Sequence, residues 1–401
     1  MKRQKIYRNK IIFFIALFLM ISCVSHGMDD VNHVSVIVEK TVYERITTRD
    51  FPSVFQAWSG IDNLPNVNFL ERIAKHDLMW SCIGLGGGLQ WFIKPIGLSE
   101  SFEPKSIQKG QEIRKQLLRL NPNIILIAEI RYRDASVDWL PEGHKWWMRD
   151  EDGQIIKGWE EGGYLRLDYK NPEFQKHVAS QAKAVIESGV VDGIMLDWWN
   201  DDEDRLSLVK EIRAAIGDSP IIIVNTNHRK APRTASYING LFMECYKSET
   251  ANDWQVIAET LTWAEQNLRP PRVNCVEVWY ENSRQDLQLM RAVTTLVLTH
   301  SNGYCLFSDP NPLPGPDHLH NWYPFWDKTL GKPLTLGSKR DDGAMTREFE
   351  KGTVIYNPMG NHTIEVIFEN LRFSQATGKS GKIHTLECPD GDIYLYQPVQ
   401  K

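Results

Sequence analysis

Eight short apolar runs rich in β-forming residues recur between residues 51 and 307, and stretches of helical periodicity separate most of them. The predicted strands are Ser53–Trp58, Asp77–Ile83, Ile124–Ile130, Gly193–Asp197, Ile221–Asn225, Gly240–Glu244, Val273–Val278 and Gly303–Phe307. The predicted helices include Ser106–Arg119, Pro172–Ser188, Asp204–Ile216, Asp253–Gln266 and Arg284–Thr299. Strands that alternate with helices build parallel βαβ units, and eight of them predict an α/β fold closed as a (β/α)₈ TIM barrel.

An open, doubly wound parallel sheet is the competing fold, and it is typical of chains that bind dinucleotides. Such a sheet carries a glycine fingerprint after its first strand. Here the run Gly84-Leu85-Gly86-Gly87-Gly88 lacks a glycine at the third required position. The closed barrel is therefore favoured, and no cofactor is expected.

The connection after the third predicted strand is unusually long and rich in tryptophan. It runs from Tyr132 to Gly163 and contains four Trp residues, and its segment Arg149–Gln154 has the composition of a hairpin turn. Long loops on a compact barrel are usually functional, and the loops that follow the strands form the wall of the binding site. We therefore expect this loop to border the site.

Beyond about residue 347 the pattern changes to short alternating runs separated by Gly, Asn, Pro and Asp. These runs are Phe349–Pro358, His362–Phe368, Ile383–Leu386 and Ile393–Gln397. Alternation with a period of two predicts antiparallel strands with one buried face. The sequence therefore predicts a barrel at residues 51–337 and a small C-terminal antiparallel β-domain, sandwich-like in form, at residues 338–401.

The first 22 residues have the layout of a signal peptide, in which basic residues precede the apolar run Ile11–Ile21. The run ends in Met20-Ile21-Ser22-Cys23, which resembles the lipobox of bacterial lipoproteins. We expect export, cleavage before Cys23 and lipidation of its thiol, with a polar tether at residues 23–50 between the membrane and the barrel. An ordinary cleaved signal with an incidental cysteine is the alternative. The stretch Val34–Val38 could form an edge strand within the tether.

Composition and missing motifs exclude several other classes. Lys and Arg number 46 against 51 Asp and Glu, a net charge of −5 with no basic patch for nucleic acid. The five cysteines after Cys23 are an odd number without CxxC spacing, so neither a disulfide scaffold nor a cysteine metal site is expected. Asp317, His318 and His320 carry metal-binding groups, but we interpret their Pro-rich segment as a solvated loop without metal. Gly-x-Ser-x-Gly and His-Glu-x-x-His motifs are absent from the sequence.

The strongest local signal is an apolar strand that ends in a carboxylate at Asp197, directly before Trp198 and Trp199. On an α/β barrel, an acid at the C-terminal end of a strand opens into the shared pocket and is typical of catalysis. The alternative is that Asp197 caps the next helix, but Asp202 and Asp204 lie closer to the predicted helix start. We therefore favour a catalytic role for Asp197.

A second apolar strand, Gly240–Glu244, also ends in an acid. Cleavage of a glycosidic bond needs two carboxylates across the bond: one attacks the anomeric carbon or activates water, and the other protonates the leaving oxygen. Asp197 and Glu244 end predicted strands four and six, close enough around a barrel mouth to face one sugar. A buried ion pair between Glu244 and an Arg or Lys is the alternative.

Other side chains near predicted strand ends are candidate ligand contacts. Glu129, Glu277 and Asp309 could bind hydroxyl groups or tune the acid pair. The remaining candidates are Trp58, Arg131, Trp198, Trp199, Asn225, Tyr246 and Trp279. Aromatic rings suit this role because their flat faces pack on the apolar face of a pyranose. Each aromatic residue fits a place in the core equally well, and Glu129 and Arg131 equally fit an ion pair.

Two parts of the chain resemble known families. The segments Tyr164–Asp168, Asn171–Glu173 and Val191–Asp197 resemble the family described as hypothetical glycosyl hydrolase family fifteen, and more distantly the endo-α-1,4-polygalactosaminidases of glycoside hydrolase family one hundred and fourteen. The segment Arg347–Pro358 resembles the start of the β-domain that follows such barrels. The resemblance implies a glycoside hydrolase with Asp197 as nucleophile or base and Glu244 as proton donor. The Trp pair after Asp197 and the long third loop depart from the family pattern.

The sequence thus predicts an exported, lipid-anchored glycoside hydrolase that acts on a polysaccharide or oligosaccharide. The alternative is a non-catalytic surface lipoprotein that captures glycan in the same cleft. The separation of the two carboxylates distinguishes these possibilities, because about 5–5.5 Å suits a retaining mechanism and 6.5–9.5 Å an inverting one. A much wider gap, or an acid held in a salt bridge, favours binding alone.

Overall fold

The computed structural model describes residues 39–82, 88–311 and 317–397, and the part of the chain from Lys40 onward forms one compact unit. Cys23, the predicted signal peptide and the possible strand Val34–Val38 lie outside the described residues. The lipid anchor and the edge strand therefore stay predictions.

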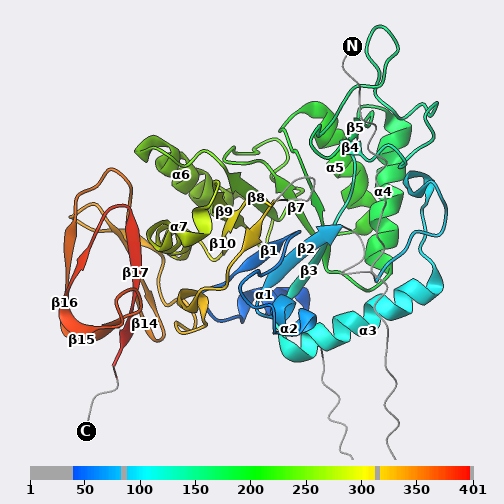
Figure 1. The fold of residues 1–401 in the computed structure, drawn as a ribbon. Helices are drawn as coiled ribbons and strands as arrows, with labels where there is room; N and C mark the ends of the chain where they lie inside the picture. Colours follow the sequence, from blue (N-terminus) through cyan, green and yellow to red (C-terminus); the bar gives the residue numbers. More distant parts are fainter. Residues whose placement is uncertain (1–38, 83–87, 312–316, 398–401) are drawn as a thin grey trace, which may run out of the picture. The chain divides into compact units, whose positions relative to one another are not determined.

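The core of the unit is a parallel sheet whose strands follow one another in chain order (Figure 1). Its eight parallel strands are β1 (Phe55–Ala57), β2 (Leu78–Cys82), β3 (Ile125–Glu129), β6 (Gly193–Leu196), β7 (Ile221–Asn225), β8 (Gly240–Cys245), β9 (Cys275–Trp279) and β10 (Tyr304–Asp309). The sheet closes where Val54 pairs in parallel with Cys305, whose N–H donates to the carbonyl of Ser53 at 3.0 Å. The predicted (β/α)₈ barrel is therefore confirmed. A short antiparallel strand, β11 (Leu319–His320), extends β10.

Helices follow most of the strands, as the helical periodicity predicts. They are α2 (Phe69–Ala74), α3 (Pro104–Leu120), α4 (Pro172–Glu187), α5 (Glu203–Ile216), α6 (Ala251–Asn267) and α7 (Leu287–His300), with short 3₁₀ turns η1 (Ile96–Leu98), η2 (Ser283–Gln285) and η3 (Pro324–Trp326). Between β7 and β8, residues 226–239 form turns without a helix. The N-cap of α5 is Asp202, whose side chain accepts the N–H of Arg205. Capping therefore does not involve Asp197.

Aromatic side chains fill the interior of the barrel. Phe55 stacks on Trp80 with ring centroids 5.0 Å apart, and Phe242 meets Trp80 edge-on at 4.8 Å. All three rings are fully buried, so they form part of the packed interior of the barrel. Neighbouring strands approach closely at Gly193, where a Cβ would lie 2.3 Å from the carbonyl oxygen of Ile221. The first residue of β6 must therefore be glycine.

A short helix, α1 (Val42–Thr47), covers the N-terminal ends of the strands, so the tether prediction is wrong for its last residues. Thr41 and Glu44 form a capping box at its start. The helix carries Arg45, which is 1% exposed and forms a bidentate ion pair with Asp192 at the start of β6. Asp192 also accepts a hydrogen bond from Arg114 at 2.9 Å. The buried ion pair between Arg45 and Asp192 therefore attaches α1 to the barrel.

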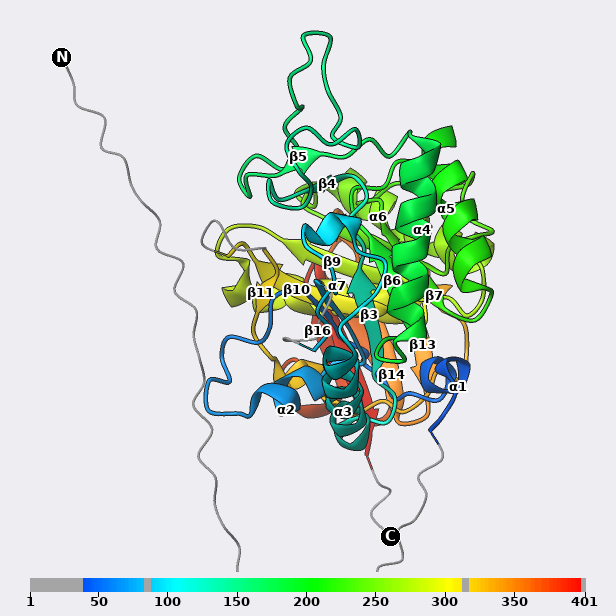
Figure 2. The same cartoon turned by 90° about the vertical axis from the view of Figure 1, so that its right-hand side faces the viewer.

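The long third connection forms an irregular loop with two short strands, β4 (Asp134–Ala135) and β5 (Leu165–Arg166), and it projects above the barrel in Figure 2. The predicted hairpin at Arg149–Gln154 is confirmed, because the N–H of Asp150 donates to the carbonyl of Gln154 at 2.9 Å. The turn includes Gly153 with φ of 79°. The two strands fold the loop back toward the barrel mouth.

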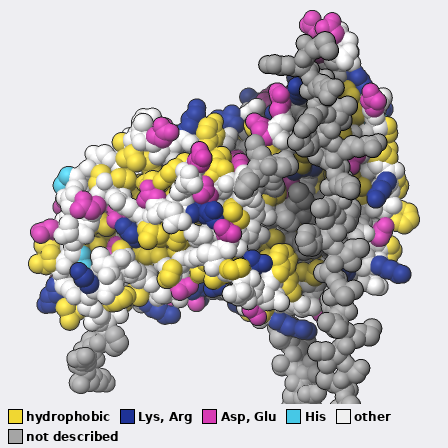
Figure 3. Space-filling view, in the orientation of Figure 1, with side chains coloured by type: hydrophobic (Ala, Val, Ile, Leu, Met, Phe, Trp, Pro, Cys, Tyr) yellow, Lys and Arg dark blue, Asp and Glu magenta, His cyan; other side chains and the backbone are white. Residues whose placement is uncertain are grey.

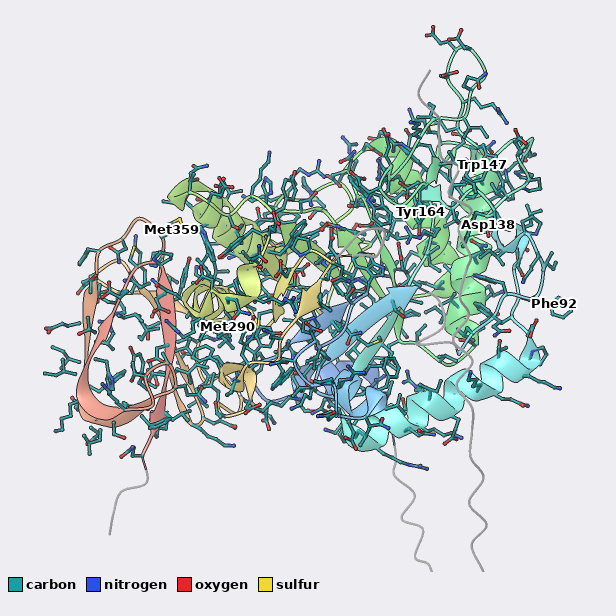
Figure 4. The ribbon with its side chains drawn as sticks, in the orientation of Figure 1. Phe92, Asp138, Trp147, Tyr164, Met290 and Met359 are labelled. Atoms are coloured by element: carbon teal, nitrogen blue, oxygen red, sulfur yellow. The ribbon has the colours of Figure 1, made fainter. Side chains whose placement is uncertain are left out.

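The C-terminal strands form one antiparallel sheet, which confirms the predicted antiparallel β-domain. Its strands are β12 (Ser338–Lys339), β13 (Met345–Phe349), β14 (Gly352–Asn357), β15 (Ile364–Ser374), β16 (Ser380–Leu386) and β17 (Asp390–Tyr396), in the order β12-β13-β14-β17-β15-β16. The sheet bends over a small core of its own, and α7 of the barrel packs against β14 and β17. Met290 on α7 and Met359 after β14 are labelled in Figure 4. The β-domain thus has a core of its own and also contacts the barrel through α7.

Acidic and basic side chains are interspersed on the face shown in Figure 3. No helix of the described part of the chain is both long and apolar enough to cross a membrane. Four cysteines whose side chains are described, Cys245, Cys275, Cys305 and Cys388, are free thiols.

Candidate active site

A pocket at the C-terminal ends of the barrel strands contains both predicted catalytic acids. This main pocket encloses about 200 Å³, which is enough for a six-membered ring, since a cavity of about 150 Å³ holds benzene. It is lined by Trp58, Arg131, Trp159, Gly162, Tyr164, Asp197, Trp198, Glu244, Asp317 and His318. Two of these residues, Trp159 and Gly162, lie in the long third loop, and Tyr164, labelled in Figure 4, lies directly before β5. The loop therefore borders the main pocket, as its composition predicts.

One asparagine holds the two acids together. The side-chain nitrogen of Asn225 donates to Asp197 Oδ1 at 2.8 Å and to Glu244 Oε2 at 2.8 Å. Its oxygen accepts the backbone N–H of Asn227 at 3.0 Å, which determines the orientation of the amide. Both hydrogens of the amide are thus used by the acids. Asn225, predicted to bind the ligand, instead positions the carboxylates.

The shared donor limits the separation of the two carboxylates. Because each bonded oxygen lies 2.8 Å from the same nitrogen, the oxygens are at most 5.6 Å apart. A separation of about 5–5.5 Å is typical of retaining glycosidases, whereas inverting enzymes need a wider gap that admits water. One glycosidic bond placed in the main pocket can contact both acids.

Burial raises the pKa of both acids. For Asp197 the pKa rises to about 6 through burial and the nearby charge of Glu129, while the hydrogen bond from Asn225 opposes the rise. For Glu244 burial raises the pKa to about 7, although the charge of His318 opposes the rise. Two interacting carboxylates titrate as a pair, with one favouring the ionised form and the other the protonated form near neutrality. Of the two predicted acids, Asp197 therefore has the greater tendency to be ionised near neutrality and Glu244 the greater tendency to be protonated.

His318 lies directly beside Glu244, and the prediction of a solvated loop at this segment is wrong. His318 is 4% exposed. Its Nδ1 is 2.7 Å from Glu277 Oε2, and its Nε2 is 4.0 Å from Glu244 Oε1. Burial disfavours protonation, but the charges of Glu277 and Glu244 outweigh burial and raise the pKa of His318 to about 9. At neutral pH the main pocket therefore contains a cation beside its acid.

A hydrogen-bonded chain behind His318 keeps the ring in place. Glu277 is fully buried and accepts the hydroxyl of Ser308 in addition to His318. Glu277 does not line the main pocket, but its charge helps to raise the pKa of Glu244, which fits the predicted alternative that it tunes the acid pair. The carbonyl of His318 lies 3.0 Å from Nδ1 of His320, which is buried against His76.

Bulky residues around the main pocket adopt strained backbone conformations. Trp58, Trp198 and His318 have φ of 45°, 53° and 82°. The left-handed region costs about 1–3 kcal/mol for such residues and is typical of functional sites. Trp58 stacks on His318 with ring centroids 4.9 Å apart, and the guanidinium of Arg133 lies 4.2 Å from the centroid of Trp198. These contacts hold the strained residues at the pocket wall.

Glu129 and Arg131 form the ion pair that their spacing suggests. Arg131 Nη1 lies 3.1 Å from Glu129 Oε1, and Trp58 Nε1 donates to Glu129 Oε2 at 2.8 Å. Arg131 also stacks over Tyr164, with its guanidinium carbon 4.8 Å from the ring centroid. Glu129 therefore anchors Trp58 and Arg131, and those two side chains face the main pocket.

Besides Glu129, Asn225 and Glu277, four more of the predicted ligand contacts are not among the residues that line the main pocket. Trp199 is fully buried beneath Tyr132, because the chain after Asp197 turns it into the core. Asp309 accepts hydrogen bonds from Arg284 and Asn282. Tyr246 and Trp279 do not line the pocket. For Trp199 and Asp309 the packing and ion pairing exclude the predicted contact.

Among the described residues, His, Cys, Asp and Glu side chains form no group of three that could hold a metal ion. The main pocket also contains residues that were not among the predicted site residues: Trp159, Gly162, Tyr164, Asp317 and His318. A tryptophan-rich loop was a signal for the first of these, whereas His318 approaches Glu244 only through the fold.

No family model matches the chain, and no curated protein matches its sequence. Its structure is similar to a noncanonic maltogenic α-amylase from Thermotoga neapolitana, with a TM-score of 0.53 and 11% identity over 86% of this chain and 99% of that one. It is also similar to an α-amylase from Geobacillus thermoleovorans, with a TM-score of 0.50 and 13% identity over 90% and 100% of the two chains. An α-amylase from Malbranchea cinnamomea has a TM-score of 0.51 and 10% identity over 89% and 97%. At such identity the likeness shows the fold: an amylase-type (β/α)₈ barrel followed by a C-terminal β-domain.

Proposed function

We propose that this protein is a glycoside hydrolase that acts on a polysaccharide or oligosaccharide. The observation that carries the proposal is the single amide of Asn225 bonded to both Asp197 and Glu244 at 2.8 Å each, which keeps the two bonded oxygens close enough for a retaining mechanism. Asp197 attacks the anomeric carbon, and Glu244 gives its proton to the departing oxygen. Glu244 then takes a proton from the water that releases the sugar from Asp197.

The aromatic wall of the main pocket supports a sugar as the ligand. Trp58, Trp159, Tyr164 and Trp198 line the pocket together with the acids. Flat rings beside carboxylates suit pyranoses, which have an apolar face and a polar rim. The solved structures with the same fold include amylases, one of them complexed with acarbose, so α-glucans belong in the first substrate panel. Membership of the narrower family suggested by residues 164–197 stays a prediction.

The test is release of reducing sugar by the soluble part of the chain from residue 39. The panel contains starch, pullulan, cyclodextrins, bacterial exopolysaccharides and plant cell-wall glycans. Product anomers are read by NMR at early times. Release with retained configuration supports the proposal. Inversion would contradict the assignment of Asp197 as nucleophile, and binding without release would favour the alternative of a glycan-capturing lipoprotein.

The two raised pKa values predict a bell-shaped dependence of kcat/KM on pH. Activity should fall at acidic pH as Asp197, with a pKa of about 6, becomes protonated, and at alkaline pH as Glu244, with a pKa of about 7, loses its proton. The optimum is expected between these two values. Initial rates across pH 4–9 on any substrate of the panel measure both limbs. A plateau that extends to pH 9 would contradict the role of Glu244 as acid.

Replacing His318 by Gln should move the alkaline limb of the pH profile of kcat/KM to higher pH. The cation of His318 opposes the rise in the pKa of Glu244, so its removal raises that pKa further. The acidic limb, which depends on Asp197, should move less. An unchanged alkaline limb in His318→Gln would mean that this ring does not control the acid.

Export and lipid anchoring are part of the proposal and rest on residues 1–23 alone. Labelling with a fatty-acid analogue in a bacterial host should modify the full chain and not the Cys23→Ser variant. A full chain that is cleaved but unlabelled would favour an ordinary signal peptide.

A further inference from the structure

A second pocket lies beside the main pocket and shares two of its wall residues. Arg131 and Tyr164 line both pockets. The second one, here the side pocket, encloses about 170 Å³ and is lined by Trp91, Ile96, Glu129, Arg131, Ala135, Ser136, Trp139 and Tyr164. Asp138, next to Trp139 in sequence, and Tyr164 are labelled in Figure 4 on the long third connection. The acid pair of the main pocket does not line the side pocket.

The aromatic walls of the side pocket are held rigidly. Trp139 packs so closely on Gly97 that a Cβ there would lie 2.4 Å from the Trp139 ring, and the N–H of Gly97 donates to the carbonyl of Trp139 at 2.9 Å. On another wall, Trp91 stacks on Phe102 with ring centroids 4.1 Å apart. Both tryptophans are nine-tenths buried or more. A ligand would therefore meet a preformed surface rather than one that must be ordered on binding.

The chemistry of the side pocket matches a sugar ring. Its walls combine the flat apolar faces of Trp91 and Trp139 with polar groups at Ser136 and in the Glu129–Arg131 ion pair. A pyranose presents an apolar face for stacking and a rim of hydroxyls that bond to such groups. The volume of about 170 Å³ admits one six-membered ring, by comparison with the cavity of about 150 Å³ that holds benzene.

The position of the side pocket along the barrel mouth defines which ring it would take. Its residues follow β2 and β3, Asp197 follows β6, and Glu244 ends β8, so Asp197 stands between the side pocket and Glu244 in strand order. The acid must lie beside the departing oxygen. A ring on the opposite side is therefore joined to the sugar that stays on Asp197.

We propose that the side pocket binds the second sugar ring on the glycone side, so that the protein recognises at least a disaccharide unit upstream of the bond it cleaves. This inference rests on the proposed function. Binding energy from a remote ring accelerates the reaction at the cleaved bond, and substrates that lack the ring lose kcat as well as affinity. The preference for two rings is set by Trp139 and its neighbours, not by the acids.

The test compares chromogenic substrates that share a leaving group. The probes are 4-nitrophenyl α-maltoside against α-glucoside, and 4-nitrophenyl β-cellobioside against β-glucoside. For the pair with the accepted anomer, wild type should have at least about tenfold higher kcat/KM on the disaccharide, since one stacked ring contributes that much. Trp139→Ala should reduce the ratio to about twofold or less by slowing only the disaccharide.

Further variants separate the pocket from the stability of the loop. Trp139→Phe, which keeps a ring, should restore much of the disaccharide preference, whereas Ser136→Leu, which fills the pocket, should abolish it. Val137→Ala is the matched control, because Val137 is 62% exposed on the same turn and lines neither pocket. Equal rates on one and two rings in wild type, or a preference that survives in both Trp139→Ala and Ser136→Leu, would overturn the inference.

Binding measurements distinguish a failure of the proposed hydrolase activity from a failure of the side-pocket inference. If no probe is cleaved, calorimetric titration of maltose, cellobiose and glucose into wild type and Trp139→Ala measures whether the side pocket binds a sugar. Disaccharide binding that weakens about tenfold in Trp139→Ala supports the side pocket and rejects the hydrolase. Absence of cleavage and of binding for all these sugars would overturn both.

Discussion

Asp197→Asn and Glu244→Gln are each expected to lower kcat/KM on a polysaccharide by about 10³-fold or more, because each removes one of the two groups that make and break bonds. The amides keep the size of the acids, and the Asn225 nitrogen can still donate to their oxygens. Release of reducing sugar measures the loss. A loss below about tenfold in either variant would contradict its catalytic role.

Leaving-group chemistry distinguishes the two roles. A substrate with an acidic phenol as leaving group needs no proton from Glu244, so Glu244→Gln should still form the sugar ester on Asp197 and release phenol in a burst. Asp197→Asn should show no burst with the same substrate, because the neutral amide of asparagine does not form the sugar ester. A burst in Asp197→Asn and none in Glu244→Gln would exchange the assignments.

Neither substitution should destabilise the fold. Burial raises the pKa of both acids, so holding them ionised at neutral pH costs folding free energy. That cost is present above the raised pKa values and disappears as the pH falls below them. The melting temperature of each amide variant at pH 8 should therefore equal or exceed that of wild type.

Asp192→Ala is expected to destabilise the protein by about 3–5 kcal/mol, because it leaves a buried guanidinium without its partner. Arg45 is 1% exposed and pairs with Asp192 through both terminal nitrogens of its guanidinium group. Arg114 and the backbone N–H of Leu126 donate to the same carboxylate at 2.9 Å. Chemical denaturation of the soluble chain measures the change in the free energy of unfolding.

Two further variants test whether the loss of stability in Asp192→Ala comes from the ion pair with Arg45. Asp197 lies at the other end of the same strand, and Asp197→Ala should lack the large loss of stability. Adding Arg45→Ala to Asp192→Ala should cost little more, since the two residues act as one unit. A loss of less than about 1 kcal/mol in Asp192→Ala, or full additivity with Arg45→Ala, would show that the ion pair does not hold α1 to the barrel.

Periodicity in the sequence was enough to predict the barrel. Strands in a parallel barrel are buried on both faces, so they appear as continuous apolar runs, and all eight predicted runs overlap a strand of the observed sheet. The capping box Thr41–Glu44 marked α1, although the polar composition of the segment led to a tether prediction instead. The contact of α7 with β14 and β17 was not predicted, because these elements are distant in sequence.

Local patterns locate the strands and place an acid near the C-terminal ends of β6 and β8, because local burial and the position of a residue within a strand depend on neighbouring residues. How those acids meet depends on contacts between distant segments: Asn225 lies between them, His318 lies beside Glu244, and Trp199 is turned into the core. These contacts join residues from different strands and loops, and their directions depend on barrel closure and on backbone conformations such as the φ of 82° at His318. A pattern of local sequence carries no information about such distances.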